Sequence, residues 1–422
     1  MIVREGYKVT ELGEIPNEWK VVNIESVAKR YSGHTPDKKI EGYWNGNIPW
    51  ISLKDTRKLD KRYIKETEDY TNINGIKKSS AVLLPKGTVV LSRDATIGKI
   101  GITETEMATS QHFINYVCTD NLDNLYLYYD FFYRKQMFES IGAGSTIKTI
   151  GLGFFKSLKI VLPPIGEQRK IAEILSQVDD KIDQTDQLIV KTKELKKGLM
   201  QRLLTKGIGY TRLKKTEIGE MPEAWNTHKV REITSLITNG FVGTASPYYA
   251  KENGIPYLMS NNIRCNRIDE RTLVKVTKEF AEQYPKSQVL FGDMLTVQSG
   301  HIGTSCSVPE KYDGVNCHAL IISRFNKSIA ESNFIAEYLN SEIGMKRLSS
   351  IFVGTTVKHI NVKDFKNFLL PIPPLSEQQK IADVLSSVDE QITHHELRKT
   401  SLEKLKQGLM QQLLTGKIRV IA

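Results

Sequence analysis

Pro163-Pro-Ile-Gly-Glu-Gln-Arg-Lys-Ile-Ala172 returns 210 residues later as Pro373-Pro-Leu-Ser-Glu-Gln-Gln-Lys-Ile-Ala382. Gly198-Leu-Met-Gln-Arg-Leu-Leu-Thr205 returns at the same offset as Gly408-Leu-Met-Gln-Gln-Leu-Leu-Thr415. Two similar halves in one polypeptide imply a pseudo-twofold molecule, and such a molecule suits a target that also comes in two parts.

Each repeated frame predicts a long helix. Residues 167–204 contain no proline and a single internal glycine, Gly198, while Gly207 and Gly416 lie where a glycine would end each helix. Apolar residues follow steps of three and four, which is the pattern of a coiled-coil seam. The predicted seam consists of Ile171, Leu175, Val178, Ile182, Leu199 and Leu203 in the first helix, and Ile381, Leu385, Val388, Ile392, Leu409 and Leu413 in the second.

The second helix start carries a capping-box pattern, Ser376-Glu-Gln-Gln379. A helix with one apolar seam needs a partner, and the other copy is the obvious candidate. Thr185, Thr192, His395 and Lys399 occupy central positions of the seam that should be apolar. We therefore expect a two-helix coiled coil that is tight at its ends and looser, or bridged by another subunit, at its centre. An ordinary helical hairpin within one domain is the alternative.

The segments between the helices read as mixed α/β domains. Thr10-Glu-Leu-Gly-Glu-Ile-Pro-Asn-Glu-Trp19 opens the first, and Thr216-Glu-Ile-Gly-Glu-Met-Pro-Glu-Ala-Trp225 opens the second. Short strands follow, then one later helix over 126–141 or 333–351. The predicted fold class is α+β, with two globular α/β domains separated by two long coiled-coil helices. The predicted boundaries are 1–162 and 207–371 for the domains, and 163–206 and 372–422 for the helices.

Composition indicates a protein of the cytosol. No run approaches about 18 apolar residues and the N-terminus lacks an apolar leader, so neither a membrane span nor a signal peptide is expected. The four cysteines form no CxxC pair, which agrees with a reducing compartment. A net charge of +11 favours a polyanionic partner such as nucleic acid, against the plainer reading of a solvated basic surface.

Motifs of catalysis are missing from the sequence. There is no Asp/Asn-Pro-Pro-Tyr/Phe tetrapeptide, with which amino-methyltransferases hold a flipped base, and no GxxxxGK[ST] phosphate loop. His301, Cys306, Cys317 and His318 match no common zinc-finger spacing, so no metal site is predicted. His112 and His318 lie at the repeat offset of 206, and we expect them to share a role as buried hydrogen-bonding histidines, with DNA contact as the alternative.

This arrangement resembles the specificity subunits of Type I restriction–modification systems. The resemblance spans about Tyr7 to Thr415 and rests on the paired Pro-Pro-x-x-Glu-Gln segments, the Gly-Leu-Met-Gln helix ends and the Gly-Glu-Ile/Met-Pro before each Trp. It implies that the two domains are target-recognition domains, each reading one half of a bipartite, asymmetric site in double-stranded DNA. The helices between them would pair antiparallel, set the spacing and dock two methyltransferase subunits. Restriction subunits complete such complexes. S-adenosylmethionine, ATP and Mg²⁺ then belong to the partners, and this chain binds no cofactor and is not an enzyme.

Three pairs of segments are candidates for DNA contact. Base readout needs polar side chains on loops that enter the major groove. In two of the pairs the flanking residues, which we call the frame, match between the domains. The polar residues at the tips of these loops differ, as two different half-sites require. The candidate base readers are Ser52, Lys54, Asp55, Arg57, Arg93 and Thr96 in the first domain, and Ser260, Asn261, Asn262, Arg264, Arg267, Gln298 and His301 in the second.

The third pair is shared by both domains, which favours sequence-independent phosphate contacts. The candidates are Ser145, Thr146 and Lys148, with Thr355, Thr356 and Lys358. Polar turns are the plain alternative for all three pairs. A free-standing DNA-binding protein of the same fold, and a coiled-coil scaffold with no DNA role, are the remaining alternatives for function.

Overall fold

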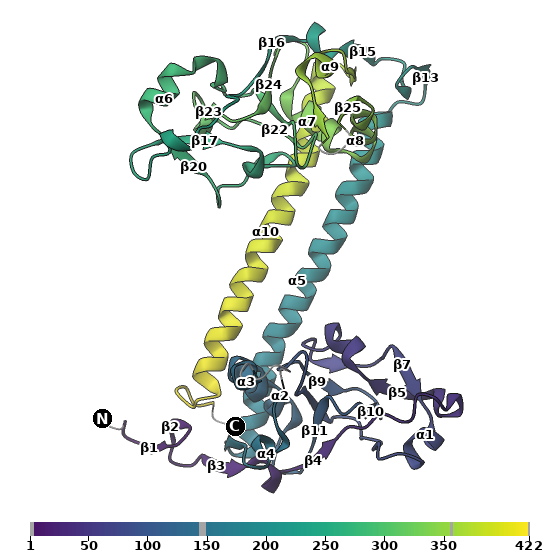
Figure 1. Ribbon diagram of the computed structural model, residues 1–422, viewed down its shortest axis with the longest axis vertical. Coiled ribbons are helices and arrows are strands. Elements are labelled where there is room, and N and C mark those ends of the chain that lie inside the picture. The colour runs from purple at the N-terminus through teal and green to yellow at the C-terminus, as the bar shows by residue number, and fades with distance from the viewer. Residues whose placement is uncertain (1–3, 143–148, 355–357, 421–422) are drawn as a thin grey trace. The chain divides into compact units, whose positions relative to one another are not determined.

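The computed structural model describes residues 4–142, 149–354 and 358–420. They form two units, one made of residues up to 186 together with those from 397 onward, and the other of residues 187–396. The two long helices are α5 (Ile165–Lys206) and α10 (Leu375–Leu413), which appear teal and yellow in Figure 1. The boundary between the units falls within each of these helices, so each unit contains a part of both.

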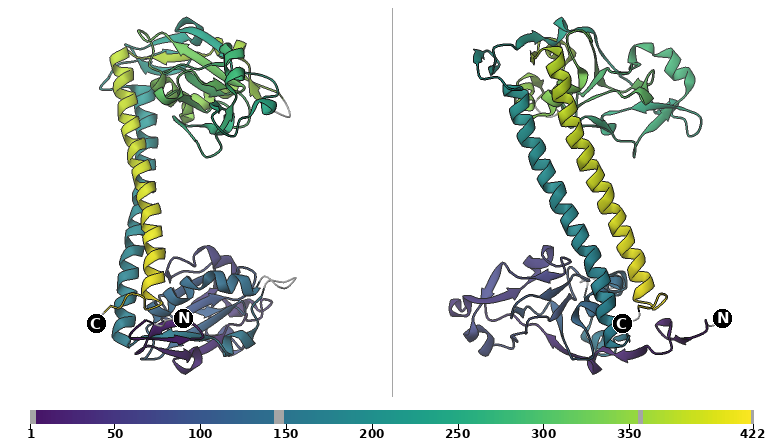
Figure 2. Two further views of the ribbon diagram at one scale, coloured as in Figure 1. Left: turned by 90° about the vertical axis from the view of Figure 1, so that its left-hand side faces the viewer. Right: turned by 180° about the vertical axis from the view of Figure 1, so that it is seen from behind.

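The helices run antiparallel in both units, as predicted. In the first unit Lys406 pairs with Asp179 at 2.7 Å and Lys399 with Asp186 at 2.7 Å, so the chain direction of α10 opposes that of α5. In the second unit Lys196 pairs with Asp389 at 2.6 Å and Lys193 with Glu396 at 2.8 Å. Figure 2 gives two further views of the helices. Part of the central seam is therefore bridged by ion pairs rather than by apolar contacts.

The predicted seam side chains differ in their burial. Ile171, Leu175, Leu203, Ile381, Leu385, Val388, Ile392 and Leu413 are buried, whereas Val178, Ile182, Leu199 and Leu409 are partly exposed. In the first unit Ile171 and Leu175 share one core with Trp19, and in the second Ile381 and Leu385 share one with Trp225. The helices are thus anchored by the domain cores at their ends.

Strands of the first unit build two main sheets. Their bounds are β1 Tyr7–Thr10, β2 Gly13–Pro16, β3 Lys20–Asn23, β4 Ala28–Ser32, β5 Trp44–Ile51, β6 Tyr63–Ile64, β7 Asp69–Thr71, β8 Val89–Ser92, β9 Ile100–Thr103, β10 Ala108–Thr109, β11 Phe113–Cys118 and β12 Lys159–Leu162. The larger sheet has the order β4-β11-β8-β9-β6 and the smaller β10-β5-β7, while β12 pairs with β3 and β1 with β2. The short helices are α1 Ile73–Lys77, α2 Asn124–Tyr133, α3 Lys135–Gly142 and α4 Leu152–Lys156.

The second unit repeats this topology. Its strands are β13 Leu213–Thr216, β14 Gly219–Pro222, β15 Asn226–Lys229, β16 Thr234–Asn239, β17 Ile255–Leu258, β18 Ile263–Arg264, β19 Arg267–Ile268, β20 Val274–Val276, β21 Met294–Val297, β22 Ser305–Ser307, β23 Asn316–Cys317, β24 Leu320–Phe325, β25 Phe352–Val353, β26 His359–Ile360 and β27 Leu369–Ile372. The helices are α6 Lys278–Gln283, α7 Ser332–Asn340, α8 Glu342–Leu348 and α9 Val362–Lys366. The order β16-β24-β21-β22 matches β4-β11-β8-β9, and β20-β17-β23 matches β7-β5-β10. The α+β class and the internal repeat are confirmed.

The prediction of one helix over 126–141 or 333–351 is wrong, because each is two helices. In the second unit the break falls at Ser341, whose hydroxyl accepts a hydrogen bond from Gly344 N and so caps α8. A side chain at Gly344 would lie 1.8 Å from the Tyr338 carbonyl oxygen, so only glycine permits this close turn.

The repeated motifs meet at a buried carboxylate in each unit. Glu377, in the first turn of α10, accepts hydrogen bonds from Trp225 Nε1 at 3.1 Å, Tyr210 Oη at 2.8 Å and Ile208 N at 2.9 Å. Glu167, in the first turn of α5, accepts from Trp19 Nε1 at 3.0 Å. The capping box predicted at Ser376 is absent, because α10 already begins at Leu375 and Ser376 therefore lies inside the helix instead of capping it.

The adjacent glutamine fastens each helix to its domain. Gln168 Nε2 donates to Pro163 O and Asn121 O, and its Oε1 accepts from Asp123 N. Gln378 makes the same three contacts with Pro373, Ile329 and Glu331. The Glu-Gln pair of the repeated motif thus ties the start of each long helix to the body of its unit.

Replacing Glu377 with alanine should destabilise the second unit. Three donors would lose their acceptor at a site where the carboxylate is 7% exposed, and one unsatisfied buried donor costs about 1–3 kcal/mol. We expect Glu377→Ala to lower the free energy of unfolding in urea by about 3 kcal/mol. Glu390→Ala, at an exposed position of α10, is the control. Equal, small losses in both variants would contradict the anchoring role.

Candidate nucleic-acid interface

The first candidate segment follows the central strand of the small sheet in each unit. In the first unit Ser52 caps a 3₁₀ turn over Leu53–Arg57, and Asp55 is fully buried. The Asp55 carboxylate accepts from Ser52 N at 2.9 Å and from Glu68 N at 2.8 Å. Its side chain is thereby engaged within the fold. Lys54 and Arg57 are exposed on the same turn.

Asn262 holds the corresponding turn of the second unit, which covers Ser260–Asn262. Asn262 is fully buried, and its amide accepts from Met259 N at 2.9 Å and donates to Asp269 O at 3.1 Å. Asn261 and Arg267 are exposed, while Ser260 and Arg264 are half-buried. The shared frame is therefore built by Asp55 and Asn262, and the side chains beside them differ between the units.

In each unit the second candidate segment, which is residues 93–96 or 298–301, lies beside the residues that follow the third segment. Ile150 N donates to Arg93 O at 2.8 Å, and Ile360 N donates to Gln298 O at 3.1 Å. Gln298 Nε2 also donates to Ile360 O. Arg93 is half-buried and Thr96 is exposed, as is His301, whose Nε2 lies 3.1 Å from Ile263 O in the first segment. The structure thus brings the second segment of the second unit against the first segment and against strand β26, which follows the third.

Of the six phosphate candidates, the structure describes only Lys358. Ser145, Thr146, Lys148, Thr355 and Thr356 lie outside the described residues. Lys358 is described and exposed, next to strand β26.

The parallel pairing of β10 with β5 brings residues 110–112 to the first segment, which the sequence did not indicate. Ser110 N donates to Ile51 O at 2.8 Å, and Arg93 N donates to His112 O at 2.9 Å. A groove of about 230 Å³ forms there. It is lined by Thr35, Lys38, Trp50, Ser52, Leu53, Lys54, Asp69, Ser110, Gln111 and His112. Thr35, Lys38 and Gln111 were not among the predicted site residues, because a contact between distant parallel strands leaves no local sequence pattern.

The predicted equivalence of His112 and His318 is wrong. Strand β23 pairs with β17 so that His318 N donates to Leu258 O, and the matching donor in the first unit is Ser110 N. His112 Nδ1 lies 2.5 Å from Asp94 Oδ1, whereas His318 Nδ1 lies 3.1 Å from Tyr257 Oη. Burial lowers the pKa of His318. The two histidines therefore lie at different places and have different partners.

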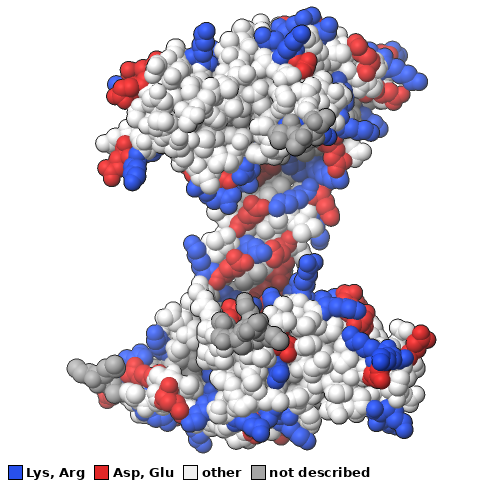
Figure 3. Space-filling view, viewed as in Figure 1, with Lys and Arg blue, Asp and Glu red and all other residues white. Residues whose placement is uncertain are grey.

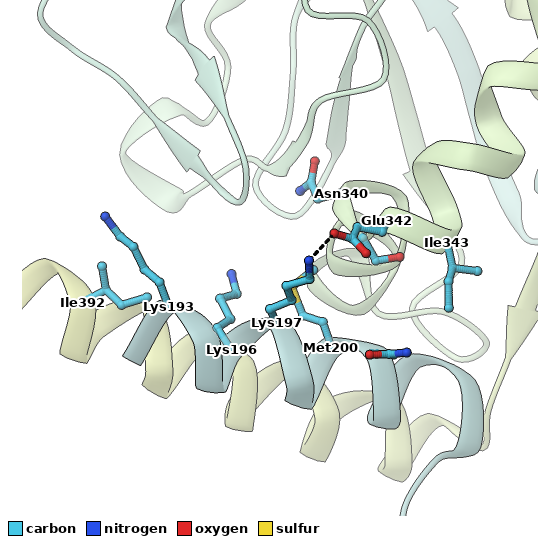
Figure 4. Close-up of a pocket in the computed structure, with 10 residues that line it drawn as sticks. Lys193, Lys196, Lys197, Met200, Asn340, Glu342, Ile343 and Ile392 are labelled. Carbon is cyan, nitrogen blue, oxygen red and sulfur yellow. Dashed lines mark ion pairs between the residues drawn. The ribbon is translucent and has the colours of Figure 1, made fainter. Parts of the chain in front are cut away.

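A second hollow, in the second unit, shows how the copies diverge (Figure 4). It measures about 240 Å³ and lies between α5 and the start of α8, with Lys193, Lys196, Met200, Asn340 and Ile343 among its walls. Asp123 and Glu331 cap equivalent helices, since their backbone N–H groups donate to Gln168 and Gln378 respectively. Counting along the helices from these caps, Tyr129 corresponds to Glu337 and Phe132 to Asn340. Two aromatic rings in the first unit are thus replaced by smaller polar side chains in the second.

The lysine beside these positions is common to both units. In the first, Lys406 lies 4.1 Å from the centre of the Phe132 ring and pairs with Asp179, which also accepts from Tyr129 Oη at 2.8 Å. In the second, Lys196 pairs with Asp389 and lies 3.4 Å from Glu337. Glu337 is 1% exposed, and burial raises the pKa of its carboxyl.

Stability of the second unit should depend on pH through Glu337. Burial raises the pKa of Glu337 in the folded state above its ordinary value of 4.5. The carboxyl therefore contributes fully to the free energy of unfolding below pH 4.5, and this contribution is lost as the pH rises through the pKa of the folded state. Glu337→Gln, which leaves Lys196 paired with Asp389, should be more stable than the parent at pH 8, and the difference should shrink as the pH falls. Urea unfolding across this range measures it. Glu342→Gln on the exposed rim is the control, and a Glu337→Gln variant that is less stable than the parent at pH 8 would refute the prediction.

Acidic and basic side chains are interspersed on the face of the protein that Figure 3 shows. Within the described residues, no group of three or more His, Cys, Asp or Glu side chains could hold a metal ion. No helix in that same part of the chain is long and apolar enough to cross a membrane.

The sequence matches the Type I restriction modification DNA specificity domain twice, over residues 16–194 and 222–404. The chain belongs to this family. It is a specificity subunit of a Type I restriction–modification system, and the alternative of a free-standing DNA-binding protein is not favoured.

Relatives match along the whole chain. The specificity subunit of the Type I restriction enzyme MjaVIII from Methanocaldococcus jannaschii is 30% identical, and the match covers 100% of this chain and 99% of that protein. The crystal structure of an S subunit from M. genitalium has a TM-score of 0.58 at 16% identity, covering 96% of this chain and 97% of the other. A chain from a structural study of assembly and conformational transition of the type I R-M system has a TM-score of 0.59 at 17% identity, covering 96% and 99%.

Proposed function

We propose that the two domains, residues 1–162 and 207–371, each read one half of a bipartite, asymmetric site in double-stranded DNA. This division of the site between the domains is supported by one observation: the same turn occurs in both units and carries different exposed side chains. Asp55 and Asn262 fix the same turn in the two units, while the exposed side chains beside them are Lys54 and Arg57 in one, and Asn261 and Arg267 in the other.

Different side chains on one frame suit two different half-sites. Lysine and arginine contact guanine in the major groove, and asparagine contacts adenine. We assign base readout to the exposed residues of these turns and to the tips at Thr96 and His301, and we assign phosphate contacts to the third segments, including Lys358. Asp55 and Asn262 act by shaping the turns.

Exchange of one domain should transfer one half-site. Residues 10–160 moved into another specificity subunit of the family should bring the first half-site with them and leave the second unchanged, because each unit has its own readers and its own core. Methylation-aware sequencing of DNA from cells that express the hybrid with its methyltransferase reads out both halves. A change in both halves would refute the division.

The long helices are proposed to dock two methyltransferase subunits and to set the spacing between the half-sites. Leu195 in α5 is 53% exposed and Leu405 in α10 is 50% exposed, and the two occupy equivalent places at the repeat offset of 210. Exposed leucines at matching places in both units suit two copies of one partner, since each copy then meets the same surface.

Single substitutions at these leucines should change the stoichiometry of the complex. Leu195→Asp and Leu405→Asp should each remove one methyltransferase subunit, and the double variant should remove both, because a charge is placed in an apolar contact. Native mass spectrometry of the co-expressed complex counts the subunits. Gln407→Asp, an exposed residue on another face of α10, is the control. Two bound subunits in the double variant would contradict this docking surface.

Catalysis is assigned to the partners. In this proposal the chain acts in the cytoplasm as the non-catalytic subunit, S-adenosylmethionine is bound by the methyltransferase subunits, and ATP and Mg²⁺ are used by restriction subunits where these are present. The study of type I R-M complex assembly among the structural relatives supports the multisubunit setting.

A further inference from the structure

We infer that Gln111 reads an adenine in the half-site recognised by the first unit, with Thr35 holding its amide in place. The inference rests on the proposed function and adds a specificity-determining residue to it. Gln111 lies in the loop between β10 and β11, on the wall of the groove described above.

The amide of Gln111 is exposed and oriented. Thr35 Oγ1 donates to Gln111 Oε1 at 2.5 Å, and Thr35 itself is half-buried. This contact uses one lone pair of the amide oxygen, so the second lone pair and both Nε2 hydrogens stay available. An amide that presents an acceptor beside a donor matches the N6 amino group and N7 of adenine in the major groove.

Two lysines line the same groove as the Gln111 amide. Lys54 is 62% exposed and lies 2.9 Å from Asp69, while Lys38 lies 5.8 Å from the centre of the Trp50 ring. Both lysines line the groove together with Gln111. Basic side chains in the same groove as a fixed amide provide the charge complementarity that a phosphate-bearing duplex requires.

The same loop of the second unit differs, so this reader belongs to one half-site. The first unit has residues 110–112 between β10 and β11, whereas the second has only residues 318 and 319 between β23 and β24. Ala319 there adopts a left-handed conformation with φ of 46°, which closes the shorter connection. Its methyl group offers no hydrogen bond, and the second unit has no counterpart of Gln111 in this loop.

Substitution of Gln111 should alter one position of one half-site. In the full chain with its methyltransferase subunits, Gln111→Ala should reduce discrimination for adenine at that position by roughly 5- to 150-fold, the range for one bidentate base contact. Gln111→Glu should also lose adenine and gain cytosine, because a carboxylate accepts from the cytosine amino group. Methylation-aware sequencing gives the motif for each variant.

Controls separate this inference from the proposal on which it rests. Gln177→Ala, an exposed glutamine on α5 of the same unit, should leave the motif unchanged. If the parent chain directs a bipartite motif and Gln111→Ala leaves every position intact, Gln111 is not a reader. If Gln111→Ala changes both halves, the assignment to one half-site is also refuted. A parent chain that directs no bipartite motif would instead refute the proposed function.

Discussion

A buried carboxylate at the start of each long helix is the interaction on which both units depend. Glu167 and Glu377 lie in first turns, where the helix dipole favours negative charge, and each accepts a hydrogen bond from the indole of a buried tryptophan. Arg419, beyond the end of α10, pairs with Glu167, while Tyr210, beyond the end of α5, donates to Glu377. The carboxylate therefore joins the start of one helix, the end of the other and the entry to the domain.

This junction also explains the glycines after the helices. Gly207 and Gly416 have φ of 63° and 68°, and a side chain at either would approach the ring of Trp225 or Trp19 to about 3 Å. The glutamate at the helix start, the tryptophan at the domain entry and the glycine after the helix are far apart in the sequence. All three are thus needed for the contact between the carboxylate and the indole. The units can diverge elsewhere, as in the replacement of Tyr129 and Phe132 by Glu337 and Asn340, because that contact is kept.

The sequence predicts what depends on local periodicity. The seam spacing and the two glycines locate the long helices, which end at Lys206, one residue before Gly207, and at Leu413, three residues before Gly416. It fails where the outcome depends on tertiary partners. Ser376 has the pattern of a helix cap, yet α10 begins one residue earlier, where Gln378 ties the helix to Pro373 and Ile329. At the interface, the sequence shows the matching segments as similar frames with different tips. It does not show that Asp55 is buried or that Gln111 lies in the groove beside Lys54, because both follow from strand pairings between distant residues.

The central claim is that this chain decides which DNA sequence its partners act on. Methylation-aware sequencing of DNA from cells that express the chain together with its companion methyltransferase subunit tests it most directly. The account predicts a bipartite, asymmetric methyladenine motif that is absent when the chain is left out. A stable complex of the chain and the methyltransferase that produces no new motif would contradict it.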